Sequence, residues 1–242
     1  MLWLAGIAAT AGACADAEPK AVSSGRAVRE PTVTMPSPGP APRVTAAEML
    51  CRESWGAQAP RTGGRPHTLG RMTIHHTAVT LGDNRLSPAR LRQHQRYHQD
   101  AQSWIDIAYH VSVDRNGNVF ELRSTDIADD TATDYDPAGH FLVVCEGNFD
   151  EEPVSEQQLH GAALAFAWAA TRFGIPTDTI AGHRDATAAT ACPGAGLYGH
   201  VKSGDLRRRV DALLADGGTV DMRRVCGPEA TAAVADIEAG RR

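Results

Sequence analysis

Two histidines and one cysteine carry the donor atoms of a metal site. His75 closes a short apolar run, His183 follows another in Gly-His-Arg-Asp, and Cys192 stands in Cys-Pro-Gly. Two neutral imidazoles and one thiolate would hold Zn²⁺ and leave the fourth tetrahedral position free for water, as in catalytic rather than structural sites. The three residues are far apart in the sequence, so the fold must bring them together. On residue types alone, two core histidines and a buried thiol explain the pattern at least as well.

Hydrophobic periodicity predicts the elements that must position these groups. Arg71–His76 is typical of a short buried strand, and His140–Gly147 is apolar enough for the centre of a sheet. Asp114–Gly117 ends in Asn-Gly, which predicts a hairpin turn because these residues tolerate positive φ. Further strands are expected at 108–113, 119–122 and 179–181, and helices at 87–99, 155–173 and 206–214.

This alternation of strands and helices predicts one α/β domain with helices packed on a sheet. A length of 242 residues agrees with one or two domains. The pattern occupies residues 46–216, which we interpret as the folded domain. Residues 217–242 are weakly patterned, and we interpret them as a C-terminal tail.

The N-terminal residues 1–14 predict an export segment. Leu2–Ala13 is an apolar stretch with the length of a signal-peptide core, too short to span a bilayer. Cys14 follows Ala-Gly-Ala, which resembles a lipoprotein cleavage site and makes a lipid anchor the alternative to simple secretion. Residues 15–45 contain six prolines among small and polar residues and predict a disordered linker. We therefore expect an exported protein that is extracellular, in the cell envelope or lipid-anchored.

The overall composition excludes several classes of protein. Lys and Arg number 24 against 29 Asp and Glu, a net charge of −5 that argues against a nucleic-acid partner. No apolar run approaches the ~18 residues of a transmembrane helix. Hydrophobic residues make up 42% of the chain and charged residues 22%, which is ordinary for a globular protein. We expect a monomer.

Several short motifs occur in a characteristic order. They are Trp55–Ala57, Ile74–Ala78, Asp106–His110, Asp114–Glu121, Glu146–Phe149, Gly182–Asp185 and Thr190–Gly194. From about Cys51 to Leu214, the chain resembles the zinc-dependent N-acetylmuramoyl-L-alanine amidases of the type 2 amidase and peptidoglycan recognition protein family. The resemblance implies a single α/β domain with a central mixed β-sheet flanked by helices. It also implies one Zn²⁺ in a surface groove at strand ends.

The resemblance implies a ligand set and a reaction. His75, the first residue of the His-His pair, would bind Zn²⁺ together with His183 and Cys192. The reaction would be hydrolysis of the amide between N-acetylmuramic acid and L-alanine, with peptidoglycan or muropeptides as partners. Family members that only bind peptidoglycan commonly lack the cysteine ligand, so Cys192 favours catalysis. A non-catalytic peptidoglycan-binding module and a structural zinc protein stay open as alternatives.

Two further residues are predicted to act at this site. Tyr109 resembles the family's active-site tyrosine, whose phenol could hold the attacking water or donate to the oxyanion. A half-buried strand tyrosine is the alternative. Thr190 could hydrogen-bond near the tetrahedral intermediate. No general base emerges, because Glu146 lies two positions after the place of the family's catalytic glutamate, where this chain has Val144.

The chain departs from the family pattern around the groove. The spacing from His183 to Cys192 is one residue longer than usual, and Asp129–Gly139 stands where a Gly-Ala-His segment is familiar. That segment is expected to border the groove. Away from it, Cys51 and Cys226 flank the domain and could pair in an exported protein.

Overall fold

The computed structural model describes residues 43–242. The export segment expected at 1–14, with Cys14, and nearly all of the linker expected at 15–45 lie outside the described residues. None of the helices within residues 43–242 combines the length and the hydropathy that a membrane-spanning helix needs.

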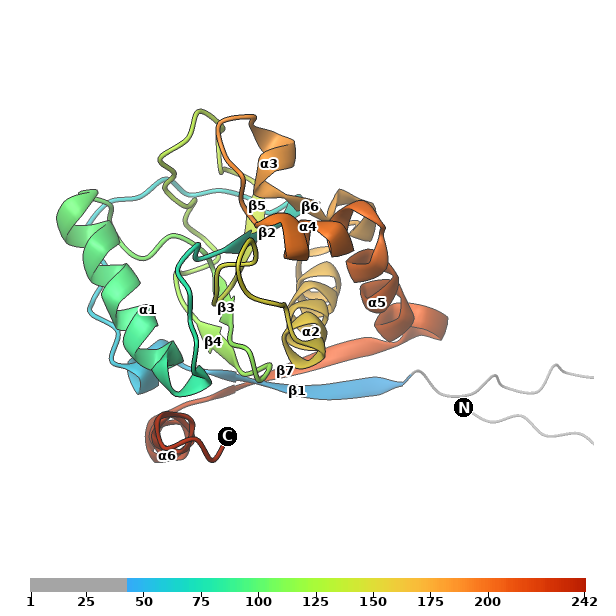
Figure 1. The fold of residues 1–242 in the computed structure, drawn as a ribbon. Helices are drawn as coiled ribbons and strands as arrows, with labels where there is room; N and C mark the ends of the chain where they lie inside the picture. Colours follow the sequence, from blue (N-terminus) through green and yellow to red (C-terminus); the bar gives the residue numbers. More distant parts are fainter. Residues whose placement is uncertain (1–42) are drawn as a thin grey trace, which may run out of the picture. The chain divides into compact units, whose positions relative to one another are not determined.

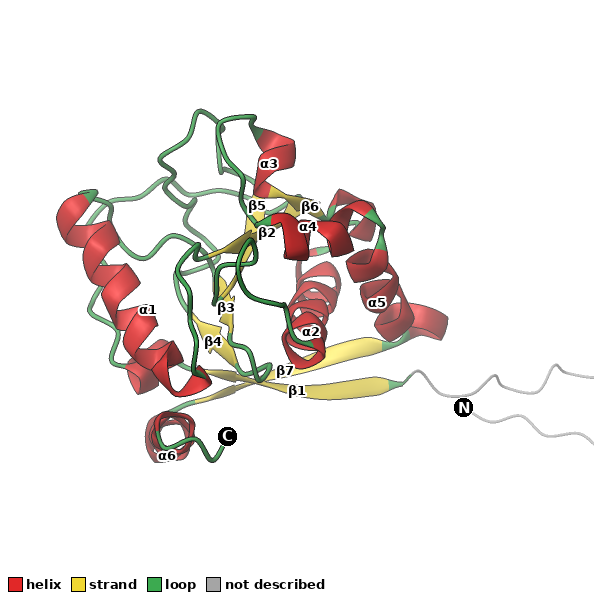
Figure 2. Cartoon of the chain, in the orientation of Figure 1, coloured by secondary structure: helices red, strands yellow, loops and turns green. Residues whose placement is uncertain are grey.

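A seven-stranded mixed sheet forms the centre of the molecule (Figures 1 and 2). The strand order is β6-β2-β5-β3-β4-β1-β7, and only the β3–β4 hairpin is antiparallel. The strands are β1 (Val44–Leu50), β2 (Arg71–His76), β3 (Val111–Val113), β4 (Val119–Glu121), β5 (His140–Cys145), β6 (Ala181–Gly182) and β7 (Thr219–Val225). β5 is buried throughout and has neighbours on both sides, as its apolar sequence predicts.

Helices cover both faces of this sheet. One hydrophobic cluster packs α2, α4 and α5 against the strands, and a second packs α1 and α6 against the opposite face. The helices are α1 (Ser87–Arg96), α2 (Glu156–Phe173), α3 (His183–Ala186), α4 (Ala195–Lys202), α5 (Asp205–Leu214) and α6 (Gly227–Glu238). The predicted fold class, an α/β domain with a central mixed sheet flanked by helices, is confirmed.

The structure corrects the interpretation of residues 217–242 as a tail. β7 pairs with β1 along its whole length, from Thr219 opposite Val44 to Val225 opposite Leu50. The three apolar residues of β7 are buried and its charged residues are exposed, and α6 buries an apolar stripe of its own. β7 is the edge strand of the sheet, and its backbone hydrogen bonds within the sheet are made with β1.

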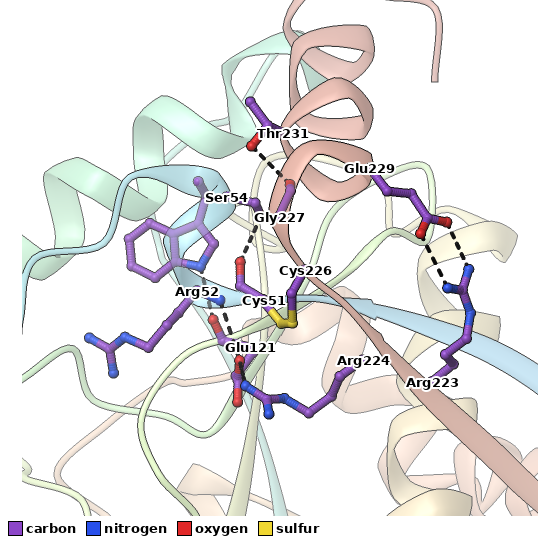
Figure 3. Close-up of a disulfide and its surroundings, with 11 residues drawn as sticks. Cys51, Arg52, Ser54, Glu121, Arg223, Arg224, Cys226, Gly227, Glu229 and Thr231 are labelled. Carbon is purple, nitrogen blue, oxygen red and sulfur yellow. Dashed lines mark hydrogen bonds and ion pairs between the residues drawn. A yellow bond between two sulfur atoms is a disulfide. The ribbon is translucent and has the colours of Figure 1, made fainter.

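A disulfide joins the chain directly beyond the adjacent carboxyl ends of β1 and β7 (Figure 3). Cys51, directly after β1, is bonded to Cys226, directly before α6. Near the disulfide, Arg224 forms an ion pair with Glu121 at 2.8 Å. The bond therefore fixes α6 to the end of β1. Cys145 is a buried free thiol.

Smaller differences from the sequence expectation cluster near the site. The strand expected at 108–113 begins only at Val111, because Tyr109 has a φ of 94° that breaks the extended backbone. The strand expected at 179–181 is replaced by a 3-10 turn at Thr177–Thr179 and the two-residue β6. α1 passes into one π-helical turn, Tyr97–Ala101, which carries the buried His98.

Candidate metal centre and cleft

The three predicted metal ligands meet at one end of the sheet. His75 lies near the end of β2, His183 begins α3 directly after β6, and Cys192 lies on the loop before α4. β2 and β6 are paired, with Ile74 opposite Gly182, so the residues that follow them in the sequence lie side by side. The two imidazole centroids are 4.7 Å apart, and one ligand atom from each of the three residues lies within 4.8 Å of the others.

The donor geometry fits a tetrahedral zinc ion. The Nδ1 atom of His75 lies 3.5 Å from Sγ of Cys192. Zn–N bonds of about 2.0–2.1 Å and a Zn–S bond of about 2.3 Å would place these atoms ~3.6 Å apart on the edge of a tetrahedron. Two imidazoles and one sulfur are also the donor types that Zn²⁺ favours in proteins.

The protonation states of these ligands follow from burial. Burial holds the pKa of His75 well below its ordinary value and lowers that of His183 to about 4, so both imidazoles are neutral and can bind a cation. Burial also raises the pKa of the Cys192 thiol to about 12. A cation beside it is therefore needed to form the thiolate at neutral pH.

The ligand group opens onto a cleft of about 390 Å³. His75, His183 and Cys192 line it together with Tyr109 and Thr190, the two residues predicted to act there. The segment 129–139 forms one wall, as its position in the sequence predicted. Other residues on the walls include Trp104, Asp130, Thr131, Thr133, Tyr135, Asn148 and Asp150.

Tyr109 is held in a strained backbone conformation beside the ligands. Its ring centroid lies 5.0 Å from that of His75. A positive φ is uncommon for a residue with a side chain and persists only where its surroundings enforce it. The Tyr109 N–H donates to Asp129 Oδ1 at 2.8 Å, its carbonyl accepts from the Arg123 N–H at 3.1 Å, and the preceding Ala108 N–H donates to His98 Nδ1 at 3.1 Å. These contacts direct the phenol toward the cleft.

Asp129 is the centre of this support. Its side chain is fully buried between the guanidinium of Arg123, 3.4 Å from Oδ1, and the imidazole of His110, 3.3 Å from Oδ2. Burial raises the pKa of Asp129 to about 7, and the nearby Arg123 opposes that rise. His110 in turn accepts from the Leu142 N–H and stacks on Phe141, which ties Tyr109 to the core.

Thr190 and Glu146 have different surroundings. The Thr190 hydroxyl accepts from the Cys192 N–H at 3.1 Å, so it orders the ligand loop as well as lining the cleft. Glu146 is absent from the cleft wall. It is buried under the sheet end, where Ser112 donates to its Oε1 at 3.0 Å. Burial raises the pKa of this carboxyl to about 8.

Two wall residues that contact His183 were not predicted from the sequence. The Thr133 hydroxyl lies 2.9 Å from His183 Nε2, and the Tyr135 ring centroid is 4.8 Å from that of His183. Both belong to the segment 129–139, which has no periodic pattern and matches no familiar motif. Its position beside the groove was predictable, but the residues that face inward were not.

The molecule is thus a mixed α/β domain with a His-His-Cys group in a cleft at the ends of its central strands. The family model for N-acetylmuramoyl-L-alanine amidase matches residues 66–195, more than half of the chain. The chain belongs to this family.

Individual relatives include both amidases and recognition proteins. The N-acetylmuramoyl-L-alanine amidase of Sus scrofa is 34% identical over 63% of this chain, which spans only 26% of that protein. Peptidoglycan-recognition protein SC2 of Drosophila melanogaster is 25% identical over 66% of this chain and 88% of its own length. The structure of peptidoglycan recognition protein LE in complex with tracheal cytotoxin, a monomeric diaminopimelic acid-type peptidoglycan, has a TM-score of 0.58 and 25% identity, covering 64% of this chain and 92% of that one.

Proposed function

We propose that the protein is a zinc-dependent amidase that hydrolyses the bond between N-acetylmuramic acid and L-alanine in peptidoglycan. The observation that carries this proposal is the complete donor set of His75, His183 and Cys192 on the wall of a cleft. Membership of the amidase family and relatives named N-acetylmuramoyl-L-alanine amidase support it. The complex of a recognition-protein relative with a peptidoglycan fragment supports the substrate class.

The residues of the cleft have separate roles in this proposal. His75, His183 and Cys192 would hold Zn²⁺, which supplies Lewis-acid polarisation of the scissile carbonyl and lowers the pKa of water. The Tyr109 phenol would donate a hydrogen bond to the oxygen that gains charge as the amide is attacked. Burial keeps the pKa of Tyr109 well above its ordinary value, so the phenol retains its proton. Thr190 would keep Cys192 in place through the backbone hydrogen bond.

A non-catalytic peptidoglycan-binding module is the second candidate function. Its specific support is the similarity to proteins named for recognition rather than hydrolysis. Such a module would use the same cleft and would have no need of the cysteine ligand. The presence of Cys192 beside His75 therefore favours the amidase.

We infer that the protein acts outside the reducing cytoplasm. The Cys51–Cys226 disulfide is of the kind that persists in oxidising compartments. This inference agrees with the export segment predicted at residues 1–14 and with a substrate in the cell wall.

Release of new amino termini from purified peptidoglycan tests the proposed function. Wild-type protein should release L-alanine amino termini, lose this activity on chelation and regain it with Zn²⁺. Cys192→Ala should be inactive because a three-ligand site cannot spare a ligand. Cys145→Ala is the matched control, since Cys145 is the other free thiol within residues 43–242 and lies in the core, so it should stay active. Binding of peptidoglycan by the wild type without any new amino termini would favour the recognition module.

A further inference from the structure

Two residues of the segment 129–139, which are not themselves proposed ligands, contact the proposed metal ligand His183. Thr133 Oγ1 lies 2.9 Å from Nε2 of His183, and the Tyr135 ring lies against the same imidazole. We propose that Thr133 is a positioning residue that selects Nδ1 of His183 as the metal-binding nitrogen. This inference rests on the proposed function, since it concerns the zinc site.

The hydrogen bonds around Thr133 are consistent with this selection. A ligand imidazole must be unprotonated at the nitrogen that binds the metal and protonated at the other. With the proton on Nε2, His183 donates to Thr133 Oγ1. The single hydrogen of the Thr133 hydroxyl then has an acceptor in Thr131 Oγ1, 2.8 Å away. Thr131 Oγ1 also accepts from the Thr133 N–H at 3.1 Å, which fixes the turn that presents Thr133.

The segment that carries Thr133 is anchored on both sides of this contact. The Asp134 carboxylate accepts from the hydroxyl of Thr187, which lies on the loop between His183 and Cys192. At the far end of the segment, the Gly139 N–H donates to His67 Nδ1 at 3.0 Å. Thr133 is thus held against His183 by contacts that do not involve the metal, so the site is preorganised before the ion binds.

Removal of the hydroxyl should weaken metal binding without unfolding the protein. Thr133→Val keeps the shape of the side chain but leaves His183 Nε2–H without an acceptor. Loss of such a partner behind a metal-binding histidine typically costs about 10–100-fold in metal affinity. Thr133→Ser restores the hydroxyl and should bind zinc within about threefold of the wild type.

Zinc affinity, measured by competition with a chromophoric chelator, tests this proposal without relying on activity. The variants are wild type, Thr133→Val, Thr133→Ser and Thr171→Val. Thr171 is the matched control, because its hydroxyl donates to the Ala167 carbonyl on α2 and does not line the cleft. We expect Thr133→Val alone to lose affinity, with a melting temperature of the zinc-free protein close to that of the wild type. Equal affinity of Thr133→Val and wild type would overturn the proposal.

The nitrogen that binds the metal gives an independent readout. In ¹⁵N-labelled, zinc-loaded wild type, long-range ¹H–¹⁵N correlation spectra should show His183 protonated at Nε2 and metal-bound at Nδ1. Metal-bound Nε2 would overturn the inference even if Thr133→Val unfolded. If wild type binds zinc but hydrolyses no peptidoglycan, the proposed function fails and the role of Thr133 stands. If wild type binds no zinc, both fail.

Discussion

At the scale of single residues, Tyr109 links the fold to the proposed chemistry. Its positive φ is enforced by three hydrogen bonds. The Tyr109 N–H donates to Asp129 and the Tyr109 carbonyl accepts from the Arg123 N–H, while the N–H of the preceding residue donates to His98. The phenol lies beside His75 because of this backbone conformation, and a regular strand would direct it elsewhere. Such strain in a well-supported residue is typical of functional sites.

Replacing Tyr109 by phenylalanine separates a catalytic from a structural role. If the phenol donates to the developing oxyanion, Tyr109→Phe should lower kcat by roughly a hundredfold, or ~3 kcal/mol of transition-state stabilisation. Zinc content and melting temperature should stay near those of the wild type, because phenylalanine fills nearly the same space. A kcat within about twofold of the wild type on a muropeptide would return Tyr109 to a packing role.

Glu146 predicts a pH dependence of stability. Its pKa in the folded protein is about 8, above the ordinary 4.5, because burial disfavours the carboxylate. Asp114 adds to the rise, while Ser112 and Arg90 oppose it. The neutral acid is therefore the form that the fold favours. Its contribution to stability is fully present below about pH 4.5 and is lost as the pH rises through about 8.

Glu146→Gln removes this titration but keeps the oxygen that accepts from Ser112. We expect the variant to gain on the order of 2–4 kcal/mol of stability relative to wild type between about pH 5 and pH 9. Thermal and denaturant unfolding at several pH values measure the difference. Parallel pH profiles for the two proteins would contradict the assignment of a neutral Glu146.

The ligand set and the residues behind it differ in how far the sequence predicts them. His75, His183 and Cys192 could be proposed as ligands because zinc chemistry limits the donor types, and the family resemblance then selected among them. Thr133 carries an ordinary hydroxyl in an irregular segment. Its role depends on three-dimensional contact with His183, which no sequence period encodes.

At the scale of secondary-structure elements, the pairing of β1 with β7 brings the first and last strands of the domain together. The two strands come from opposite ends of the domain and are joined beyond their ends by the Cys51–Cys226 bond. The central strands β2 and β5 were predictable because they are short apolar runs. β1 and β7 were missed because charged residues such as Glu48 and Arg223, which pair with each other, interrupt their apolar pattern. Half of the buried residues of α6 are alanines, so its apolar stripe was equally inconspicuous.

Loss of the disulfide should destabilise this outer pair of strands. The bond joins residues 175 positions apart, so its removal increases the conformational entropy of the unfolded chain. The double variant Cys51→Ser, Cys226→Ser should lose about 2–4 kcal/mol of unfolding free energy. Thermal unfolding with and without reductant provides the measurement. Wild type should melt lower in reductant and the double variant should not respond. Identical melting of both proteins would show that the bond contributes nothing.

At the scale of the whole molecule, the sheet lies between Tyr109 and the larger of the two hydrophobic clusters. The large helix α2 packs on one face, and Tyr109 and the second hydrophobic cluster lie on the other. The irregular segment 129–139 forms a wall of the cleft at the ends of these strands. The α/β class was predictable from the order of elements. The shape of the cleft was not, because it depends on how loops that are far apart in the sequence come together at the strand ends.

Mass spectrometry of the products from a defined disaccharide-peptide muropeptide is the decisive test of the proposed hydrolysis. We expect two products from the zinc-loaded protein, the free disaccharide and an intact stem peptide with L-alanine at its amino terminus. Together their masses should equal that of the substrate plus one water. An unchanged substrate under conditions where the protein is folded, zinc-loaded and bound to the muropeptide would contradict the proposed function. Cleavage at a sugar–sugar or peptide–peptide bond would contradict it as well.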